Sequence, residues 1–327
     1  MHRLYKLLLC GLVCLISMSS CAMLDQSGQQ TPRPLVAVVV KSTQSTFWKT
    51  VQSGVKAAAN EYNLRYTFEG PLSEEDAETQ NQLIEQAVAS GAKALVISAI
   101  DATASVDVIE RAIQAGVKVI VMDSDAQAEG ISVRVGTDNY AAGQTAAQAL
   151  LNSEKAVRSI GMVGFDVRTE NGQARERGFI DAIEADGRAK IVEQIHSPSD
   201  SARVQAATRA ILRRHPDLDA IVTFNEITTL GVGHAMEEMK CSERVHVIGF
   251  DNNVVSVGML ESGELDTLIV QNPFAMGYLC MENAALLLAN KAVSESNIKT
   301  EIRVISRDNM YSEENQRFLF SFTEMTQ

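Results

Sequence analysis

The segment Ala115–Asp123, with the sequence AGVKVIVMD, decides the fold class of this chain. Its first five residues are typical of a tight turn from a helix into a strand, and the apolar run Val119–Met122 then stops at Asp123. Short, β-branched runs between helical stretches predict parallel strands. Ligands of open α/β sheets bind beyond the carboxyl ends of the strands, so Asp123 is a candidate ligand contact.

Three further apolar runs end at a polar side chain in the same way. They are Ala220–Phe224 followed by Asn225, Val245–Phe250 followed by Asp251, and Leu268–Val270 followed by Gln271. Together with Asp123 they supply two carboxylates and two amides, which can hydrogen-bond a polyol. We therefore expect these four side chains to converge on one small molecule, in an arrangement that favours binding over reaction.

Strand and helix candidates alternate along most of the chain. The strand candidates are Leu35–Val40, Leu64–Phe68, Ala94–Ser98, Val117–Met122, Val133–Gly136, Ser159–Val163, Lys190–Gln194, Ala220–Phe224, Val245–Gly249, Thr267–Val270 and Ile302–Ile305. The helix candidates are Phe47–Glu61, Glu75–Ser90, Thr103–Ala115, Tyr140–Asn152, Gly172–Ala185, Ala202–Arg214, Thr228–Met239 and Phe274–Ala289. This order predicts an α/β fold with parallel sheets covered by helices on both faces. About ten strands are many for one sheet, so we expect two.

Glycines stand where several of these helices should stop. Gly91, Gly116 and Gly187 are expected to adopt the left-handed conformation that ends a helix. At the other end of a helix, Thr46 is a candidate N-cap for Phe47–Glu61.

The N-terminus predicts export from the cytoplasm. A basic start is followed by the apolar stretch Leu7–Ile16, which has the length of a signal-peptide core and is too short to span a bilayer. Met18-Ser19-Ser20-Cys21 then resembles a bacterial lipobox, in which Cys21 is lipidated. The alternative is ordinary cleavage near Cys21 without lipid. We expect residues 1–21 to be a lipoprotein signal peptide and residues 22–34, which are polar and contain proline, to be a tether.

Length and charge limit the class of protein. The rest of the chain is long enough for two lobes of ordinary domain size, and its 46% hydrophobic and 21% charged residues are those of a globular protein. No later stretch is long and apolar enough to be a transmembrane helix. The net charge of −12 argues against nucleic acid as a partner.

No pattern of catalytic or metal-ligating residues stands out. The histidines are scattered, no Cys/His spacing suggests zinc, and neither a G-x-S-x-G elbow nor a phosphate-binding glycine loop occurs. Cys241 and Cys280 could form a disulfide, but free and mostly buried thiols are the favoured interpretation. We expect no cofactor, no metal and no enzyme activity.

Several motifs in order give the chain a family resemblance. They are Phe47-Trp48, Met122-Asp123, Gly136-Thr-Asp-Asn139, Arg175-Glu-Arg-Gly-Phe179, Phe224-Asn225, Gly249-Phe-Asp251, Gln271-Asn272-Pro273 and Asp308-Asn309. From about Leu35 to about Tyr311 the chain resembles periplasmic sugar-binding proteins of the ribose-binding type. The resemblance implies two doubly wound lobes joined by three crossings, with the ligand in the cleft. The lobes would be residues 35–137 plus 272–301 and residues 138–271 plus 302–327.

The resemblance also implies ligand-binding residues. Matched position by position, they are Phe47, Trp48, Asp123, Asn139, Arg175, Asn225, Asp251 and Gln271. The aromatic pair would stack on the C–H face of a sugar, carboxylates would accept hydroxyls, and the arginine would donate to oxygens. Other interpretations stay open. Asp123 or Asn225 could be a helix cap, Phe47 or Trp48 core, Arg175 a surface residue, and Asn139 part of a lobe crossing.

Three positions depart from the ribose-binding pattern. Ser124 follows Asp123 where an arginine is common, so a cation is lost, while Ser124 and Asp125 add possible acceptors. Ser199 stands where the second lobe has an aromatic residue, and Ser45 where an asparagine contacts the ligand. These changes argue against ribose itself and leave a pentose, a hexose, a related polyol or a non-sugar ligand.

Two functions fit this pattern. The first is a lipid-anchored, monomeric substrate-binding component of an ABC sugar importer, which closes on its ligand and is then read by a membrane permease. The second is an extracytoplasmic sensor that presents ligand occupancy to a histidine kinase or chemoreceptor. A cytoplasmic repressor of the same fold is excluded if residues 1–21 are a signal, because no DNA-binding segment precedes Leu35.

Overall fold

The structure is a computed structural model in which residues 33–153 and 156–320 are described. The predicted signal segment, Cys21 and nearly all of the predicted tether lie outside the described residues. None of the helices in the described part of the chain is long and apolar enough to cross a membrane.

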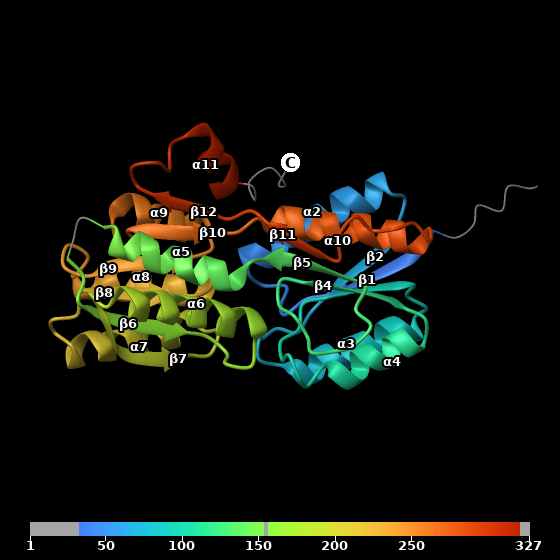
Figure 1. Ribbon diagram of the computed structural model, residues 1–327, viewed down its shortest axis with the longest axis horizontal. Coiled ribbons are helices and arrows are strands. Elements are labelled where there is room, and N and C mark those ends of the chain that lie inside the picture. The colour runs from blue at the N-terminus through green and yellow to red at the C-terminus, as the bar shows by residue number, and fades with distance from the viewer. Residues whose placement is uncertain (1–32, 154–155, 321–327) are drawn as a thin grey trace, which may run out of the picture. The chain divides into compact units, whose positions relative to one another are not determined.

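Two six-stranded sheets organise the described residues (Figure 1). The first has the order β11-β5-β4-β3-β1-β2, and all its neighbouring strands are parallel. Its strands are β1 (Leu35–Val39), β2 (Arg65–Glu69), β3 (Ala94–Ile97), β4 (Lys118–Met122), β5 (Val133–Thr137) and β11 (Asn297–Thr300). We call this sheet and the helices packed on it the first lobe.

The second sheet has the order β12-β10-β9-β8-β6-β7. Its strands are β6 (Ser159–Gly164), β7 (Lys190–His196), β8 (Ala220–Thr223), β9 (His246–Phe250), β10 (Thr267–Val270) and β12 (Arg303–Ser306). Only β12 is antiparallel to its neighbour, β10. This sheet and its helices form the second lobe, so the predicted pair of parallel α/β sheets is confirmed except at β12.

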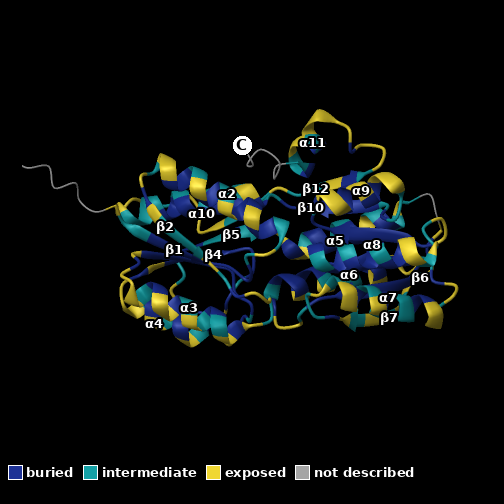
Figure 2. Ribbon diagram, turned by 180° about the vertical axis from the view of Figure 1, so that it is seen from behind, coloured by how far each residue is buried: buried dark blue, intermediate teal, exposed yellow. Residues whose placement is uncertain are grey.

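Helices cover both faces of each sheet. In the first lobe α2 (Thr46–Glu61) and α10 (Pro273–Leu288) share one core cluster with the sheet, while α3 (Ala77–Ala89) and α4 (Val106–Gln114) share another. In the second lobe α5 (Asn139–Leu151) and α6 (Glu170–Asp186) lie on one face, and α7 (Ser201–Arg214), α8 (Glu226–Met239), α9 (Val254–Ser262) and α11 (Glu313–Leu319) pack on the other. Figure 2 shows the central strands buried and the outward faces of the helices exposed.

The chain passes between the sheets three times. It leaves the first sheet after β5 to start α5, returns after β10 to start α10, and passes from β11 to β12. The first two crossings lead into α5 and α10, and each of these helices packs very closely against a neighbouring helix of its lobe. A Cβ atom on Gly54 of α2 would lie 2.0 Å from the carbonyl oxygen of Phe274 in α10, and one on Gly143 of α5 would lie 2.0 Å from that of Arg175 in α6. These contacts fix the positions of α2 and α6, which both carry site residues.

Several local predictions were correct and others were wrong. Gly91, Gly116 and Gly187 have φ angles of 82°, 84° and 75°, as predicted for left-handed helix ends. Thr46 is not the cap of α2: it is the first helical residue, and the Ser45 side chain accepts from the Trp48 backbone N–H instead. The sequence interpretation also missed β11, α9 and α11. β11 reads NIKT and contains no apolar run, α9 reads VVSVGMLES with apolar residues on all its sides, and α11 is only seven residues long, so none of the three shows a clear hydrophobic period.

Candidate functional site

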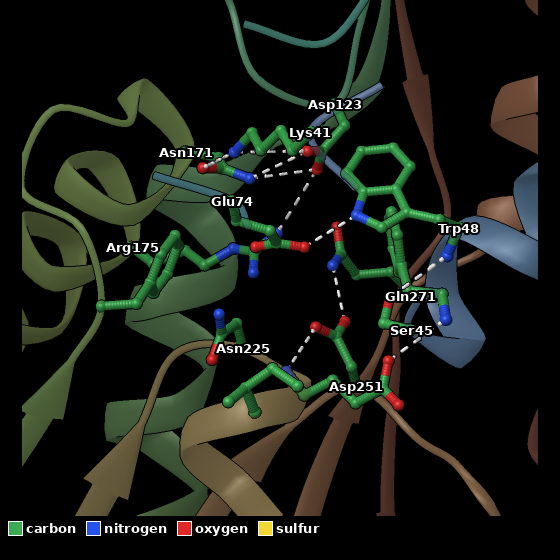
Figure 3. Close-up of a pocket in the computed structure, with 14 residues that line it drawn as sticks. Lys41, Ser45, Trp48, Glu74, Asp123, Asn171, Arg175, Asn225, Asp251 and Gln271 are labelled. Atoms are coloured by element: carbon green, nitrogen blue, oxygen red, sulfur yellow. Dashed lines mark hydrogen bonds and ion pairs between the residues drawn. The ribbon is translucent and has the colours of Figure 1, made fainter. Parts of the chain in front are cut away.

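A cavity lies between the carboxyl ends of the strands of the two lobes (Figure 3). Side chains of both lobes line it, namely Lys41, Ser45, Phe47, Trp48, Glu74, Asp123, Phe165, Asn171, Arg175, Asn225, Glu226, Ile227, Asp251 and Gln271. Its volume is about 30 Å³, which holds a few water molecules at most. The two lobes are therefore closed on each other in this conformation.

Asp123 directly follows β4 with a left-handed backbone, φ 60°, so it continues no strand and caps no helix. Its carboxylate accepts hydrogen bonds from Ser98 Oγ at 3.1 Å and from Asn171 Nδ2, at 3.1 Å to Oδ1 and 3.0 Å to Oδ2. Two cations lie just beyond hydrogen-bond distance, Lys41 Nζ at 3.8 Å and Arg175 Nη2 at 3.9 Å. Asp123 thus gathers residues of both lobes around one carboxylate.

Lys41 is a site residue that the sequence interpretation missed. It follows β1 after Val40, is only 2% exposed, and donates from Nζ to Asn171 Oδ1 of the second lobe at 3.0 Å. Burial lowers the pKa of Lys41, and the nearby Asp123 opposes this shift. The rule that identified Asp123, a polar residue directly after an apolar strand, also applies to Lys41. Lys41 brings a cation to the cavity in a chain that has Ser124 in place of an arginine.

Arg175 lies on α6 and is only 1% exposed. The alternative that it is a surface residue of an amphipathic helix is therefore wrong. Its Nε donates to Asn139 Oδ1 at 2.9 Å, and Nη1 donates to the carbonyl oxygen of Phe224 at 2.8 Å. The guanidinium also packs over the Phe250 ring, 5.0 Å from its centroid. Within the described part of the chain, Nη2 has no hydrogen-bond partner, and Figure 3 shows the guanidinium directed into the cavity. A buried donor without a partner is costly, so this atom is suited to a ligand acceptor.

Asp251 follows β9 as Asp123 follows β4, with φ 64°. Its Oδ1 accepts from Gln271 Nε2 at 2.6 Å, and Oδ2 accepts from the Glu226 backbone N–H at 3.1 Å. Gln271 is itself held by Thr137, whose hydroxyl donates to Oε1 at 2.7 Å. Burial raises the pKa of Asp251 to about 6, although Arg175 acts in the opposite direction.

Both aromatic residues at the start of α2 line the cavity. Their rings meet edge to face, with centroids 4.9 Å apart and an interplanar angle of 85°. Adjacent residues point in different directions on a helix, but both Phe47 and Trp48 can reach this cavity because α2 begins at its border. A third aromatic residue, Phe165 after β6, lines the cavity from the second lobe. Ser199, which stands where the ribose-binding pattern has its second-lobe aromatic residue, does not line this cavity.

Glu226, also missed from sequence, joins the two lobes. From the first turn of α8 its Oε2 accepts from the Phe47 backbone N–H at 3.2 Å, and its Oε1 accepts from the Thr46 N–H at 3.4 Å. Asn253 Nδ2 donates to the same Oε1 at 2.8 Å. No acidic residue lies in the first turn of α2, so Glu226 of the other lobe supplies the negative charge that a helix N-terminus favours.

Of the remaining predicted residues, one lines the cavity and the others lie outside it. Asn225 lines the cavity and also caps α8, with Oδ1 accepting from the Thr228 N–H at 2.9 Å. Asn139 does not line this cavity: it lies behind Arg175, which it holds, and lines a neighbouring pocket. Ser124 and Asp125, expected as possible ligand acceptors, do not line it either, and Asp125 pairs with Arg134 at 2.7 Å. Among the described residues no group of three or more acidic, histidine or cysteine side chains could hold a metal ion.

Comparison with known proteins agrees with this geometry. The model of the periplasmic binding protein domain family matches residues 36–292. The chain belongs to this family. Its members are extracytoplasmic substrate-binding proteins rather than enzymes.

Individual relatives extend over nearly the whole chain. A D-ribose/D-allose-binding protein of Pseudomonas aeruginosa is 31% identical over 300 residues, covering 89% of this chain and 94% of the relative. A carbohydrate transporter solute-binding protein of Agrobacterium radiobacter, solved with D-arabinose, has a TM-score of 0.85 at 25% identity and covers 88% and 99% of the two chains. An ABC transporter solute-binding protein of Agrobacterium vitis, solved with D-fucose, has a TM-score of 0.84 at 29% identity, with coverage of 87% and 99%.

Proposed function

We propose that this protein binds a monosaccharide in the cavity between its lobes and delivers it to an ABC importer. The observation that carries the proposal is the convergence of Asp123, Asp251 and Arg175 on one closed cavity, with Arg175 Nη2 lacking a partner in the described structure. Free donors and carboxylate acceptors side by side match a hydroxyl group, which both donates and accepts. The sugars named for its relatives support this ligand class.

Ligand entry requires the lobes to open. A cavity of about 30 Å³ is too small for a monosaccharide, and several hydrogen bonds link the lobes directly. Opening would break these contacts, and closing over a sugar would replace some of them by contacts with the ligand. A ligand that contacts both lobes only when they are closed shifts the population toward that state, which a permease can then recognise.

A panel of sugars tests this function. Binding of D-ribose, D-allose, D-arabinose and D-fucose would be screened by thermal shift and measured by calorimetry, with amino acids and nucleosides as competing ligand classes. We expect at least one monosaccharide to bind, and Arg175→Ala and Asp251→Ala each to weaken its affinity by about 1.5–3 kcal/mol, because each variant removes a hydrogen bond between a ligand hydroxyl and a charged side chain in a closed site. Arg177→Ala, an exposed arginine on the same helix, is the matched control. Unchanged affinity in both site variants would rule out this cavity as the binding site.

We also propose the boundaries of the two lobes and a monomeric state. The lobes are residues 35–137 plus 272–301 and residues 138–271 plus 302–327, a division supported by the strands that each sheet contains. The protein acts as a monomer, which analytical ultracentrifugation would test.

Relatives whose names describe import binding favour delivery to an importer over the sensory alternative. Sugar uptake measured in cells lacking this protein would decide between the two, because a sensor would change gene expression and leave uptake by a constitutively expressed importer intact.

Anchoring through a lipid on Cys21 is a separate proposal, supported by the lipobox-like sequence at residues 18–21. Cys21→Ser should move the protein from the membrane fraction to the soluble fraction. Cys241→Ser, at a position in the second lobe, should leave the distribution unchanged. Membrane association that persists in Cys21→Ser would contradict the lipid anchor.

A further inference from the structure

The cavity holds more acidic than basic side chains. Four carboxylates line it, those of Glu74, Asp123, Glu226 and Asp251, and two cations oppose them, Lys41 and Arg175. In a closed and largely dry site, charges without a partner are expensive. The distribution of partners among the four carboxylates therefore indicates which of them is available to a ligand.

Three of the four carboxylates are well provided with partners. Asp123 accepts from Ser98 and Asn171 and lies within 4 Å of both cations. Asp251 accepts one hydrogen bond on each oxygen. Glu226 accepts three, two of them from the N-terminus of α2.

Glu74 differs from the other three. It lies in the loop between β2 and α3, and its Oε1 accepts from Trp48 Nε1 at 2.8 Å. That is its one hydrogen bond among the described residues, so Oε2 is free to accept from a ligand. Figure 3 shows this carboxylate directed into the open space between Arg175 and Trp48. Burial raises the pKa of Glu74, and the charge of Lys41 lowers it.

A ligand for this arrangement must offer an acceptor and a donor close together. The unpartnered Arg175 Nη2 needs an oxygen, whereas Glu74 Oε2 needs an N–H or O–H group. A neutral sugar could supply both through hydroxyls but would leave the excess of negative charge in place. An ammonium group next to a hydroxyl would supply both and reduce that excess. The rings of Phe47, Trp48 and Phe165 would also favour a cation.

We propose that Glu74 selects a ligand that carries a basic nitrogen beside a hydroxyl, such as an amino sugar. This inference rests on the proposed function and narrows its ligand class. Glu74 acts as the partner of the ammonium group, while Arg175 binds the neighbouring hydroxyl oxygen.

Matched sugar pairs test the inference in the intact mature protein. Calorimetry would compare D-glucosamine with D-glucose and D-galactosamine with D-galactose at about pH 6.5, where an amine of ordinary pKa is protonated. We expect the amino sugar of at least one pair to bind at least tenfold more tightly. Glu74→Gln should abolish that preference, so that the two sugars of the pair bind with similar affinity. Glu78→Gln, an exposed glutamate at the start of α3, should retain the preference.

Each result has a clear meaning. Neutral sugars that bind as tightly as their amino counterparts would overturn the role of Glu74 and leave the proposed sugar-binding function standing. A preference for amino sugars that persists in Glu74→Gln would also overturn it. If neither these pairs nor the neutral panel bind, both the inference and the proposed function fail. The comparison within the wild-type protein remains decisive even if Glu74→Gln does not fold.

Discussion

The two strand-end aspartates occupy matching places in the two lobes but have different surroundings. Each directly follows a strand in a left-handed conformation, and each donates its backbone N–H to the next strand, Asp123 to Val135 at 2.9 Å and Asp251 to Ile269 at 3.0 Å. Asp123 has two cations within 4 Å. Asp251 instead accepts hydrogen bonds from neutral groups, and its pKa is raised to about 6. The fold repeats the backbone position, whereas the neighbouring side chains decide the charge.

The largest expected effect is the difference in unfolding free energy between the variants that lack one or the other aspartate. Asp123→Ala would leave Lys41 and Arg175 buried without their shared partner, so the ligand-free protein should lose about 3–5 kcal/mol of unfolding free energy. Asp251→Ala removes no close ion pair and should cost distinctly less. Denaturant titration of both variants measures this difference. An equal loss in the two variants would contradict the electrostatic contrast between the lobes.

The acidity of Asp251 gives a second test. Its pKa is raised from 3.8 to about 6, so the folded protein holds this proton more tightly than the unfolded chain does. The resulting stability is fully present below about pH 4 and is lost as the pH rises through about 6. The unfolding free energy of the wild type relative to Asp251→Asn should therefore fall by roughly 3 kcal/mol between about pH 4 and pH 7. A difference that stays constant over this range would show that Asp251 titrates normally.

The smallest expected effect concerns the contact between the lobes. Glu226→Gln keeps the shape of the side chain but removes its charge from the N-terminus of α2. We expect the closed state to be weakened by about 1 kcal/mol, which lowers ligand affinity roughly fivefold. Glu237→Gln, an exposed glutamate of α8, is the matched control and should bind normally. Equal affinities of the two variants in calorimetry would show that Glu226 does not stabilise closure.

The apolar strands of the fold were predictable. The strands β1, β3, β4, β8 and β9 are uniformly apolar or nearly so, and such runs are typical of parallel strands that are buried on both faces of the sheet. The short strand β11 reads NIKT and has no such signal. It pairs with β5 because the chain returns to the first lobe through α10 and then reaches this edge of the sheet, and nothing within four residues of sequence indicates that pairing.

Site residues at strand ends were predictable for the same reason. Asp123, Asn225, Asp251 and Gln271 follow apolar strands, and that position alone places them at the cleft edge of a sheet. Glu74 and Asn171 stand outside any such pattern, one in a loop and the other early in α6. Phe165 does follow a strand, but because it is apolar itself it does not mark the end of the apolar run.

The sequence by itself determined the α/β class, the two sheets and the strand-end side chains, because burial imposes a local pattern that can be read along the chain. Only the tertiary structure decided which charges meet. Lys41, Glu74, Arg175 and Glu226 come from separate segments of both lobes and act on one another over a few ångströms. Electrostatic interactions depend on distance in space and on burial, and neither is encoded in the spacing of residues along the sequence.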